Sequence, residues 1–253
     1  CMTIVKIYII LTSVFILSFC IRTEAQTCGF GCLGLGGFYA GYNIQKYNPA
    51  GLNGYIKAFN ETHASTMAQP LPQFGSATGF RVGANLFRTK YNKFLFSAKG
   101  YYQFLKEDQQ AVEVVSDETI TTKYTLNLNY YGVGMDFGYS LGKYLDLKIA
   151  DAQITFHSAD LDILATSSSS DQKESSFSNS SMRVGYQVGS GLVFHLVGDY
   201  ISLEATAGYA SFKFDKLQNT DSVSGDTVEA VSNFIENGGF FGILQLNVGI
   251  PLY

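Results

Sequence analysis

The histidines are the first place to look for chemistry in this sequence. The chain has three, His63, His157 and His195, and only His157 is followed at once by a hydroxyl, Ser158, and then by two aspartates. A histidine that takes the proton of a serine hydroxyl would make that serine a nucleophile. On a β-strand, however, His157 and Ser158 point to opposite faces and cannot form such a pair without a turn. The sequence therefore predicts no enzyme, and neither of the other two histidines has an evident partner.

Metal and cofactor chemistry is equally poorly supported. A zinc site needs several Cys or His ligands close together, and the histidines are scattered along the chain. Charged residues make up 15% of the chain, its net charge is −4, and no basic segment offers a footprint for nucleic acid. We expect no cofactor, no metal and no nucleic-acid partner.

A second group of reactive side chains consists of charged residues within segments of alternating polarity. The residues expected to form an internal charge network are Arg81, Lys99, Asp136, Arg183 and Glu204, and Asp146, Lys148 and Asp151 share the same polar faces. An unpaired buried charge is costly, so we expect Glu204 to pair with Arg183 or Arg81 in a network that supports folding. The alternative is a narrow gated ion path whose selectivity comes from these charges.

The segments that carry these charges read as β-strands, because apolar and polar residues alternate with a period of two. In the last of them Leu244, Leu246 and Val248 alternate with Gln245 and Asn247. The predicted strands are 34–47, 78–88, 93–106, 121–140, 144–157, 181–196, 200–214 and 239–253. The apolar phase flips at Tyr130-Tyr131 and slips again near Ala150-Asp151, and we interpret both positions as bulges.

The connections between these strands alternate in length. Short turns fall at 89–92, 141–143 and 197–199, whereas polar loops occupy 48–77, 107–120, 158–180 and 215–238. An even number of strands, with long loops at one end and short turns at the other, predicts an all-β, eight-stranded antiparallel up-and-down transmembrane β-barrel. In that class the long loops are extracellular, and both the N and the C terminus are periplasmic.

Composition favours the same class. The chain is 46% hydrophobic and 15% aromatic, with 26 glycines and 15% charged residues, against roughly 25% charged residues in ordinary soluble domains. A soluble, secreted lipocalin-like barrel that binds a ligand is the other architecture with eight alternating strands. It would turn the apolar faces inward and place Arg81 and Lys99 in water, and the asymmetry of the loops favours the membrane.

The first 25 residues read as a signal peptide. An apolar run from Ile7 to Ile21 is too short to span a membrane as a helix, and Ala25 is the small residue expected before a cleavage site. We place the cut before Gln26, which leaves residues 26–33 as a short periplasmic leader and 34–253 as the barrel domain. Lipoprotein processing at Cys20 is the alternative, although Phe19 is bulky where such motifs carry a small residue.

Two modifications are predicted from local sequence. Cys28 and Cys32 are the only cysteines after the cleavage site, and in an oxidising compartment they either pair across the Gly29 and Gly31 turn or remain two thiols. Ser222 and Thr227 each follow an aspartate and precede a valine. These two tripeptides resemble the O-glycosylation acceptor sites of Bacteroidota envelope proteins, and an ordinary polar loop is the alternative.

Several segments together carry a family resemblance. They are the Ala25-Gln26 site, the stretches TGFRVGA (78–84) and LNLNYYGVG (126–134), and the ending NVGIPLY (247–253). The chain resembles the eight-stranded outer-membrane barrels of the OmpA and OmpX type, and more narrowly the outer-membrane β-barrel family of Bacteroidota, to which PorT-like proteins belong. Pro251 departs from the pattern of the closing strand, although its terminal aromatic resembles the signal read by the barrel-insertion machinery.

The resemblance implies a location in the cell outer membrane, with outer-membrane lipid and the insertion machinery as partners. It implies a non-enzymatic structural or interaction role, exerted on an envelope or extracellular protein through the loops or through the periplasmic rim. A small porin-like channel is the competing function.

Overall fold

The computed structural model describes residues 36–116, 118–167, 173–179, 181–198, 200–219 and 233–249. Several predicted features lie outside these residues. They are the signal peptide 1–25, Cys20, the leader 26–33 with Cys28 and Cys32, the acceptors Ser222 and Thr227, and the ending 250–253.

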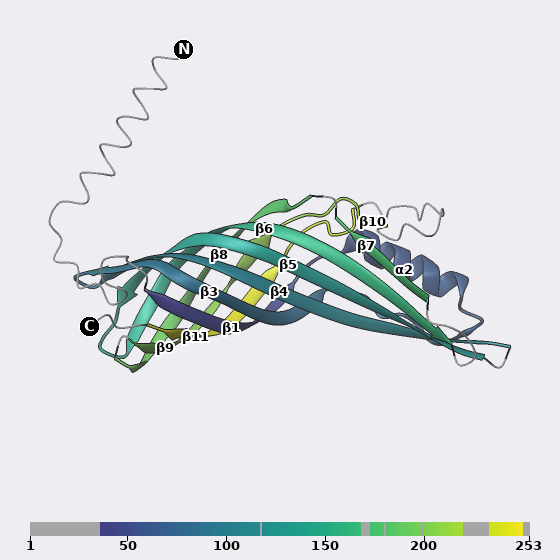
Figure 1. Cartoon of the computed structure of the whole chain (residues 1–253), viewed down its shortest axis with the longest axis horizontal. Coiled ribbons are helices and arrows are strands. Elements are labelled where there is room, and N and C mark those ends of the chain that lie inside the picture. Colours follow the sequence, from purple (N-terminus) through teal and green to yellow (C-terminus); the bar gives the residue numbers. More distant parts are fainter. Residues whose placement is uncertain are drawn as a thin grey trace, which may run out of the picture.

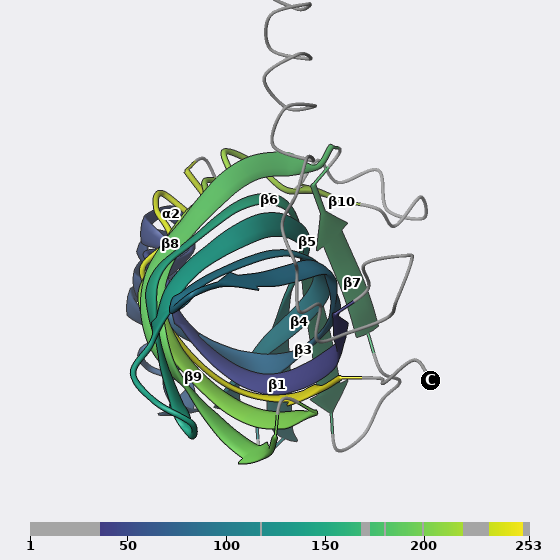
Figure 2. The same ribbon diagram turned by 90° about the vertical axis from the view of Figure 1, so that its left-hand side faces the viewer.

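Eight long strands form the barrel: β1 (Gly37–Lys46), β3 (Ser76–Tyr91), β4 (Phe94–Val115), β5 (Glu118–Ser140), β6 (Leu145–Ser167), β8 (Arg183–Val197), β9 (Ile201–Ser211) and β11 (Phe240–Val248). Each pairs antiparallel with its neighbours in the order β3-β1-β11-β9-β8-β6-β5-β4, and the pairing of β3 with β4 closes the ring (Figures 1 and 2). The prediction of a closed, eight-stranded antiparallel barrel is confirmed.

The two ends of the barrel differ, as the loop lengths predicted. Short turns and the described chain ends lie at one end, which we call the turn end. The other end carries α2 (Ala50–Thr62), β2 (Met67–Gln69), β7 (Lys173–Ser178) and β10 (Gln218–Asn219), together with the far halves of β4, β5 and β6; we call this end the head (Figure 1). Among the described residues, no helix has the length and apolarity needed to cross a membrane.

Two of the predicted loops are largely strand, and a third, 48–77, contains α2 and β2. Residues 107–120 belong to β4 and β5, which continue to a tight hairpin at Ser116, and much of 158–180 belongs to β6 and β7. β5 has 23 residues, whereas about 11 suffice to cross a bilayer. About half of this strand therefore extends beyond the membrane, and its polar outward residues made the segment look like a loop.

The side-chain pattern inverts along these long strands. In the turn-end half of β5, Tyr131 and Val133 point outward and Gly132 points inward. In the head, Asn127 and Asn129 point outward, whereas Leu126, Leu128 and Tyr130 are buried inside the barrel. The predicted bulge at Tyr130-Tyr131 is wrong, because β5 pairs with β4 and β6 through both residues without a shift. The phase of the apolar residues changes here because the surroundings change from lipid to water, while the backbone alternates without interruption.

Outward aromatic side chains mark this boundary. Each barrel strand contributes one exposed ring to this boundary: Tyr42, Phe80, Phe104, Tyr131, Phe156, Tyr186, Tyr209 and Phe240. Several of them touch, such as Tyr42 and Phe80 with centroids 5.5 Å apart. Exposed aromatics recur near the turn end, among them Phe94, Phe96 and Tyr144. Paired aromatic girdles around an apolar band are the mark of a barrel embedded in the outer membrane, so the protein is an outer-membrane barrel.

The apolar outward face also decides against the lipocalin-like alternative. In the membrane-spanning half the barrel holds its charges inside and its apolar residues outside, which is the reverse of a soluble barrel. Only the head, whose apolar residues point inward, is built like a soluble protein.

Candidate functional site

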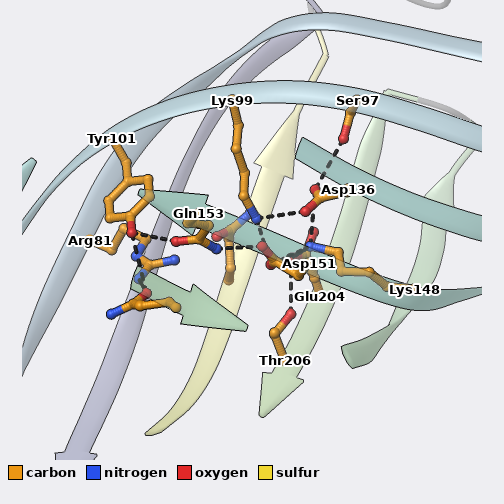
Figure 3. Close-up of polar contacts among 12 residues, drawn as sticks. Arg81, Ser97, Lys99, Tyr101, Asp136, Lys148, Asp151, Gln153, Glu204 and Thr206 are labelled. Atoms are coloured by element: carbon orange, nitrogen blue, oxygen red, sulfur yellow. Dashed lines mark hydrogen bonds and ion pairs between the residues drawn. The ribbon is translucent and has the colours of Figure 1, made fainter. Parts of the chain in front are cut away.

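Five charged side chains meet inside the turn-end half of the barrel, and we call them the lumen cluster. They are Lys99 on β4, Asp136 on β5, Lys148 and Asp151 on β6, and Glu204 on β9 (Figure 3). The Lys99 Nζ lies 2.9 Å from Asp136 Oδ1 and 2.6 Å from Asp151 Oδ2. The Lys148 Nζ lies 3.2 Å from Asp136 Oδ2 and 3.3 Å from Asp151 Oδ2, and it also donates to Glu204 Oε1. All five are largely buried, so three carboxylates share two ammonium groups away from bulk water.

A bulge in β6 makes this cluster possible. Residues three apart on a regular strand point to opposite faces, so Lys148 and Asp151 could not both face the lumen. The register of β6 shifts between these two residues against both β5 and β8, and both side chains are buried inside. The slip predicted near Ala150-Asp151 is therefore confirmed, and its consequence is a lysine and an aspartate on the same face.

The predicted pairing of Glu204 is wrong. Glu204 contacts Lys148, and neither Arg183 nor Arg81 is among its ion-pair partners. Arg183 lies at the far end of β8, where its side chain is 40% exposed and its Nη2 is 3.9 Å from Asp215 Oδ2. The strands are tilted, so residues that share a face need not lie at the same height in the barrel. Of the five predicted network residues, Lys99, Asp136 and Glu204 do belong to the lumen cluster. The sequence alone does not give the height of each residue along the barrel axis, so Arg81 and Arg183 could not be separated from them.

Arg81 belongs to a separate hydrogen-bonded layer closer to the head. Its Nε donates to Gln103 Oε1 at 2.6 Å, its Nη2 donates to Gln187 Oε1 at 3.1 Å, and its guanidinium stacks on the ring of Tyr101 at 3.8 Å. Tyr101 donates to Gln153, which in turn donates to Asp151, so the two layers are connected (Figure 3). Arg81 is thus held by neutral groups and an aromatic face.

The head end of the lumen is filled by apolar side chains. Leu105, Leu126 and Leu128 point inward from β4 and β5, and Phe212 and Phe214 close the space from the segment after β9; all five are buried. Among the described residues, the polar lumen therefore ends against an apolar core, which is the arrangement of a filled barrel.

The histidines take three different environments. His157 is buried inside, between the rings of Tyr130 and Phe212, and its Nε2 lies 2.7 Å from Thr155 Oγ1. Ser158 points away from it, and its Oγ donates to the carbonyl of Asn129, so the prediction that the two residues cannot form a catalytic pair is confirmed.

The other two histidines do have partners, contrary to the sequence-based expectation. His195 Nε2 lies 2.6 Å from Asp146 Oδ2 at the turn end, and both side chains are buried. The ring of His63 packs at a tilt against that of Phe59, with centroids 4.4 Å apart, at the end of α2. Among the described residues, no three His, Cys, Asp or Glu side chains are placed to hold a metal ion.

The head is held together by side chains that the sequence did not single out. Helix α2 buries Leu52 and Ile56, and its Asn53 and Asn60 lie seven residues apart, on the same side of the helix. The segment 71–75, which we call the return segment, runs back from α2 to β3 beside them. Asn60 Nδ2 donates to the Leu71 carbonyl at 2.9 Å, and the Leu71 N–H donates back to Asn60 Oδ1 at 3.0 Å.

Asn53 forms the same two-bond clamp with Phe74, at 2.9 Å in both directions. Beyond it, Glu107 accepts the N–H of Ser76 at 2.8 Å and the hydroxyl of Tyr47 at 2.6 Å. Burial, and then the adjacent charge of Glu107, raise the pKa of Tyr47 well above its usual value. The connection over the head is therefore held in one conformation. The spacing of seven residues between Asn53 and Asn60 is the sequence signal that could have indicated a helix with these two amides on the same side.

Comparisons with known proteins concern the barrel shape. No protein-family model matches the chain, and no curated protein matches its sequence. Among solved structures, Neisserial surface protein A is similar, with 14% identity, a TM-score of 0.41, and coverage of 86% of this chain and 99% of that one. Ail, the attachment invasion locus protein of Yersinia pestis, has 11% identity and a TM-score of 0.37, covering 85% of this chain and 97% of that one. The likeness extends to the fold alone.

Proposed function

We propose that the protein is a non-enzymatic outer-membrane barrel that displays its head to a protein partner. The observation that carries this proposal is the inversion of side-chain polarity along β4, β5 and β6. These strands leave the membrane and continue as a sheet that covers an apolar core, as in a soluble protein. A barrel that served only as a membrane anchor would not need this additional folded part. The clamps of Asn53 and Asn60 hold this surface in one conformation, which reduces the entropy lost on binding.

The orientation is part of the proposal: the head faces outward and the turn end faces the periplasm. Outer-membrane barrels carry short turns on the periplasmic side, and the described chain ends lie at the turn end here, where the Gly249 N–H donates to the Tyr200 carbonyl at 2.6 Å. To test this, single cysteines are placed at Glu61 on α2 or at Lys143 in a turn, in a variant whose four native cysteines are serine. A membrane-impermeant maleimide should label only the cysteine at position 61 in intact cells. Labelling only at position 143 would show that the orientation is the opposite of the one proposed.

Partner binding is tested by photocrosslinking in cells. The hairpin between β4 and β5 projects from the head, and its Val114 side chain is exposed. A photoreactive residue at Val114 should give a discrete protein adduct. The matched control is the same residue at Val133, which faces lipid and should give lipid adducts. If both positions yield only lipid adducts, the interaction role is refuted.

The competing channel function makes the opposite prediction for planar bilayers. The apolar core above Arg81 should keep the refolded barrel silent. Stable openings that disappear in Arg81→Ala or Glu204→Ala variants would favour the channel. We also propose that the protein belongs among the Bacteroidota barrels, where a PorT-like role would use the periplasmic rim. Protein adducts from a photoreactive residue at Lys143 would support an interaction at this rim.

A further inference from the structure

A surface hollow lies on the outer side of the head. It has a volume of about 180 Å³ and is lined by Gln69, Pro72, Asp108, Gln109, Gln110 and Lys123. We call it the glutamine hollow. It is formed where β2 and the start of the return segment meet β4 and β5, away from the lumen cluster.

The walls of this hollow are fixed before any ligand arrives. Pro72 lies between the two residues that the helix asparagines clamp, Leu71 and Phe74. The Gln109 Nε2 donates to the carbonyl of Gln73 at 3.4 Å, which ties β4 to the same segment. The hollow is therefore a built feature of the head, with little rearrangement needed for binding.

The two charged residues that line the hollow, Asp108 and Lys123, carry opposite charges and pair with each other, and Lys106 beside the hollow also pairs with Asp108. Asp108 accepts a hydrogen bond from Thr125 Oγ1 at 2.6 Å, and the ammonium groups of Lys106 and Lys123 lie 3.1 Å and 3.6 Å from its oxygens. Slight burial works against ionisation, but these hydrogen bonds and charges together lower the pKa of Asp108, which stays ionised at neutral pH. A charged ligand would have to displace one of these contacts, so a neutral polar ligand is favoured.

The remaining lining chemistry suits hydroxyl groups. The amides of Gln69 and Gln110 offer N–H donors and carbonyl acceptors, which match the donor and acceptor character of neighbouring hydroxyls on a sugar ring. The Gln109 Nε2 already donates to Gln73 and Glu107, so this amide offers its carbonyl oxygen as an acceptor. The Pro72 ring supplies an apolar surface for the C–H face of such a ring. We propose that the glutamine hollow binds one neutral sugar residue.

The height of the hollow indicates where that sugar comes from. Phe104 is the β4 residue in the band of exposed aromatic side chains that marks the membrane boundary. Asp108 lies four residues further along β4, a distance of about 13 Å along the strand. This is just above the lipid, where the saccharides of outer-leaflet glycolipids lie. The same chemistry would accept a free glycan. The inference rests on the proposed function, because it requires the head to face outward.

Binding is tested with the full-length protein refolded in detergent micelles. The probes are the methyl glycosides of glucose, galactose, mannose and N-acetylglucosamine, detected by saturation-transfer NMR. At least one glycoside should bind, and Gln110→Ala should weaken it about fivefold, the effect of losing one neutral hydrogen bond. Asn129→Ala, which removes an outward amide of the same sheet outside the hollow, should leave the affinity unchanged.

Three results would overturn the proposal: no glycoside binds the folded protein, the two variants behave alike, or inorganic phosphate binds in place of the glycosides. The source of the sugar is distinguished in vesicles with and without a glycolipid that carries the preferred sugar. Loss of soluble glycoside binding in the glycolipid vesicles identifies a headgroup, and retained binding identifies a free glycan. A Val114 adduct that persists when sugar binding fails would refute this site while leaving the interaction role intact.

Discussion

Removing the positive charge of Lys148 should destabilise the barrel more than any other single change in the lumen cluster. Its ammonium group contacts Asp136 at 3.2 Å, Asp151 at 3.3 Å and Glu204. Lys148→Met keeps much of the side-chain volume but leaves three buried carboxylates with Lys99 alone. Breaking a buried ion pair from one side typically costs about 3 to 5 kcal/mol, and we expect a loss in this range.

The matched variant on the acidic side should cost much less. Glu204→Gln leaves two carboxylates and two ammonium groups, so the charges balance, and the loss should be about 1 kcal/mol from the weakened hydrogen bonds. Lys57→Met is the surface control, because Lys57 and Glu61 form an exposed ion pair at 3.9 Å. Such pairs contribute little, and we expect a change below about 0.5 kcal/mol.

The assay is urea unfolding of the refolded barrel. The chain contains no Trp, so unfolding is followed by heat-modifiable gel mobility and by far-UV circular dichroism. The reasoning is refuted if Lys148→Met is no more destabilising than Lys57→Met, because Lys148 would then be hydrated. It is also refuted if Glu204→Gln costs as much as Lys148→Met, because the balance of charge would then not decide the outcome.

Three further outcomes are expected. Leu128→Ala should cost about 2 to 5 kcal/mol and its neighbour Asn129→Ala less than about 0.5, since only Leu128 lies in the apolar core of the head; equal costs in urea unfolding would contradict the inverted pattern. The double change of Asn53 and Asn60 to Ala should speed amide exchange and protease cleavage in the return segment without altering heat-modifiable mobility, whereas unchanged exchange would show that the clamps are unimportant. The raised pKa of Tyr47 means that its contribution to stability is complete below about pH 10 and is lost as the pH rises further, because the unfolded chain ionises first. Head stability measured between pH 9 and 11 should therefore fall less steeply in Tyr47→Phe, and parallel slopes would rule out this coupling.

Much of the architecture follows from the sequence alone. Alternation with a period of two is a local property of the chain, so it determined the number of strands and the membrane-facing half, although two of the four long loops expected between them are largely strand. The same alternation placed Lys99, Asp136 and Glu204 inside the barrel. The change of apolar phase at Tyr130-Tyr131 is also present in the sequence, but the sequence alone does not distinguish a bulge from a change of surroundings.

The tertiary structure decided what depends on height and surroundings. Strand tilt determines which inward residues lie side by side, so only the closed barrel could assign Glu204 to Lys148 and Arg183 to the head. The apolar interior of the head depends on cover from α2 and the return segment, which contact residues far away in the chain, such as Glu107 and Asn233. A strand buries its apolar face wherever water is excluded, either against lipid or inside the barrel. Alternation in the sequence is the same in both cases, so only the folded structure shows which of the two surrounds each half of a strand.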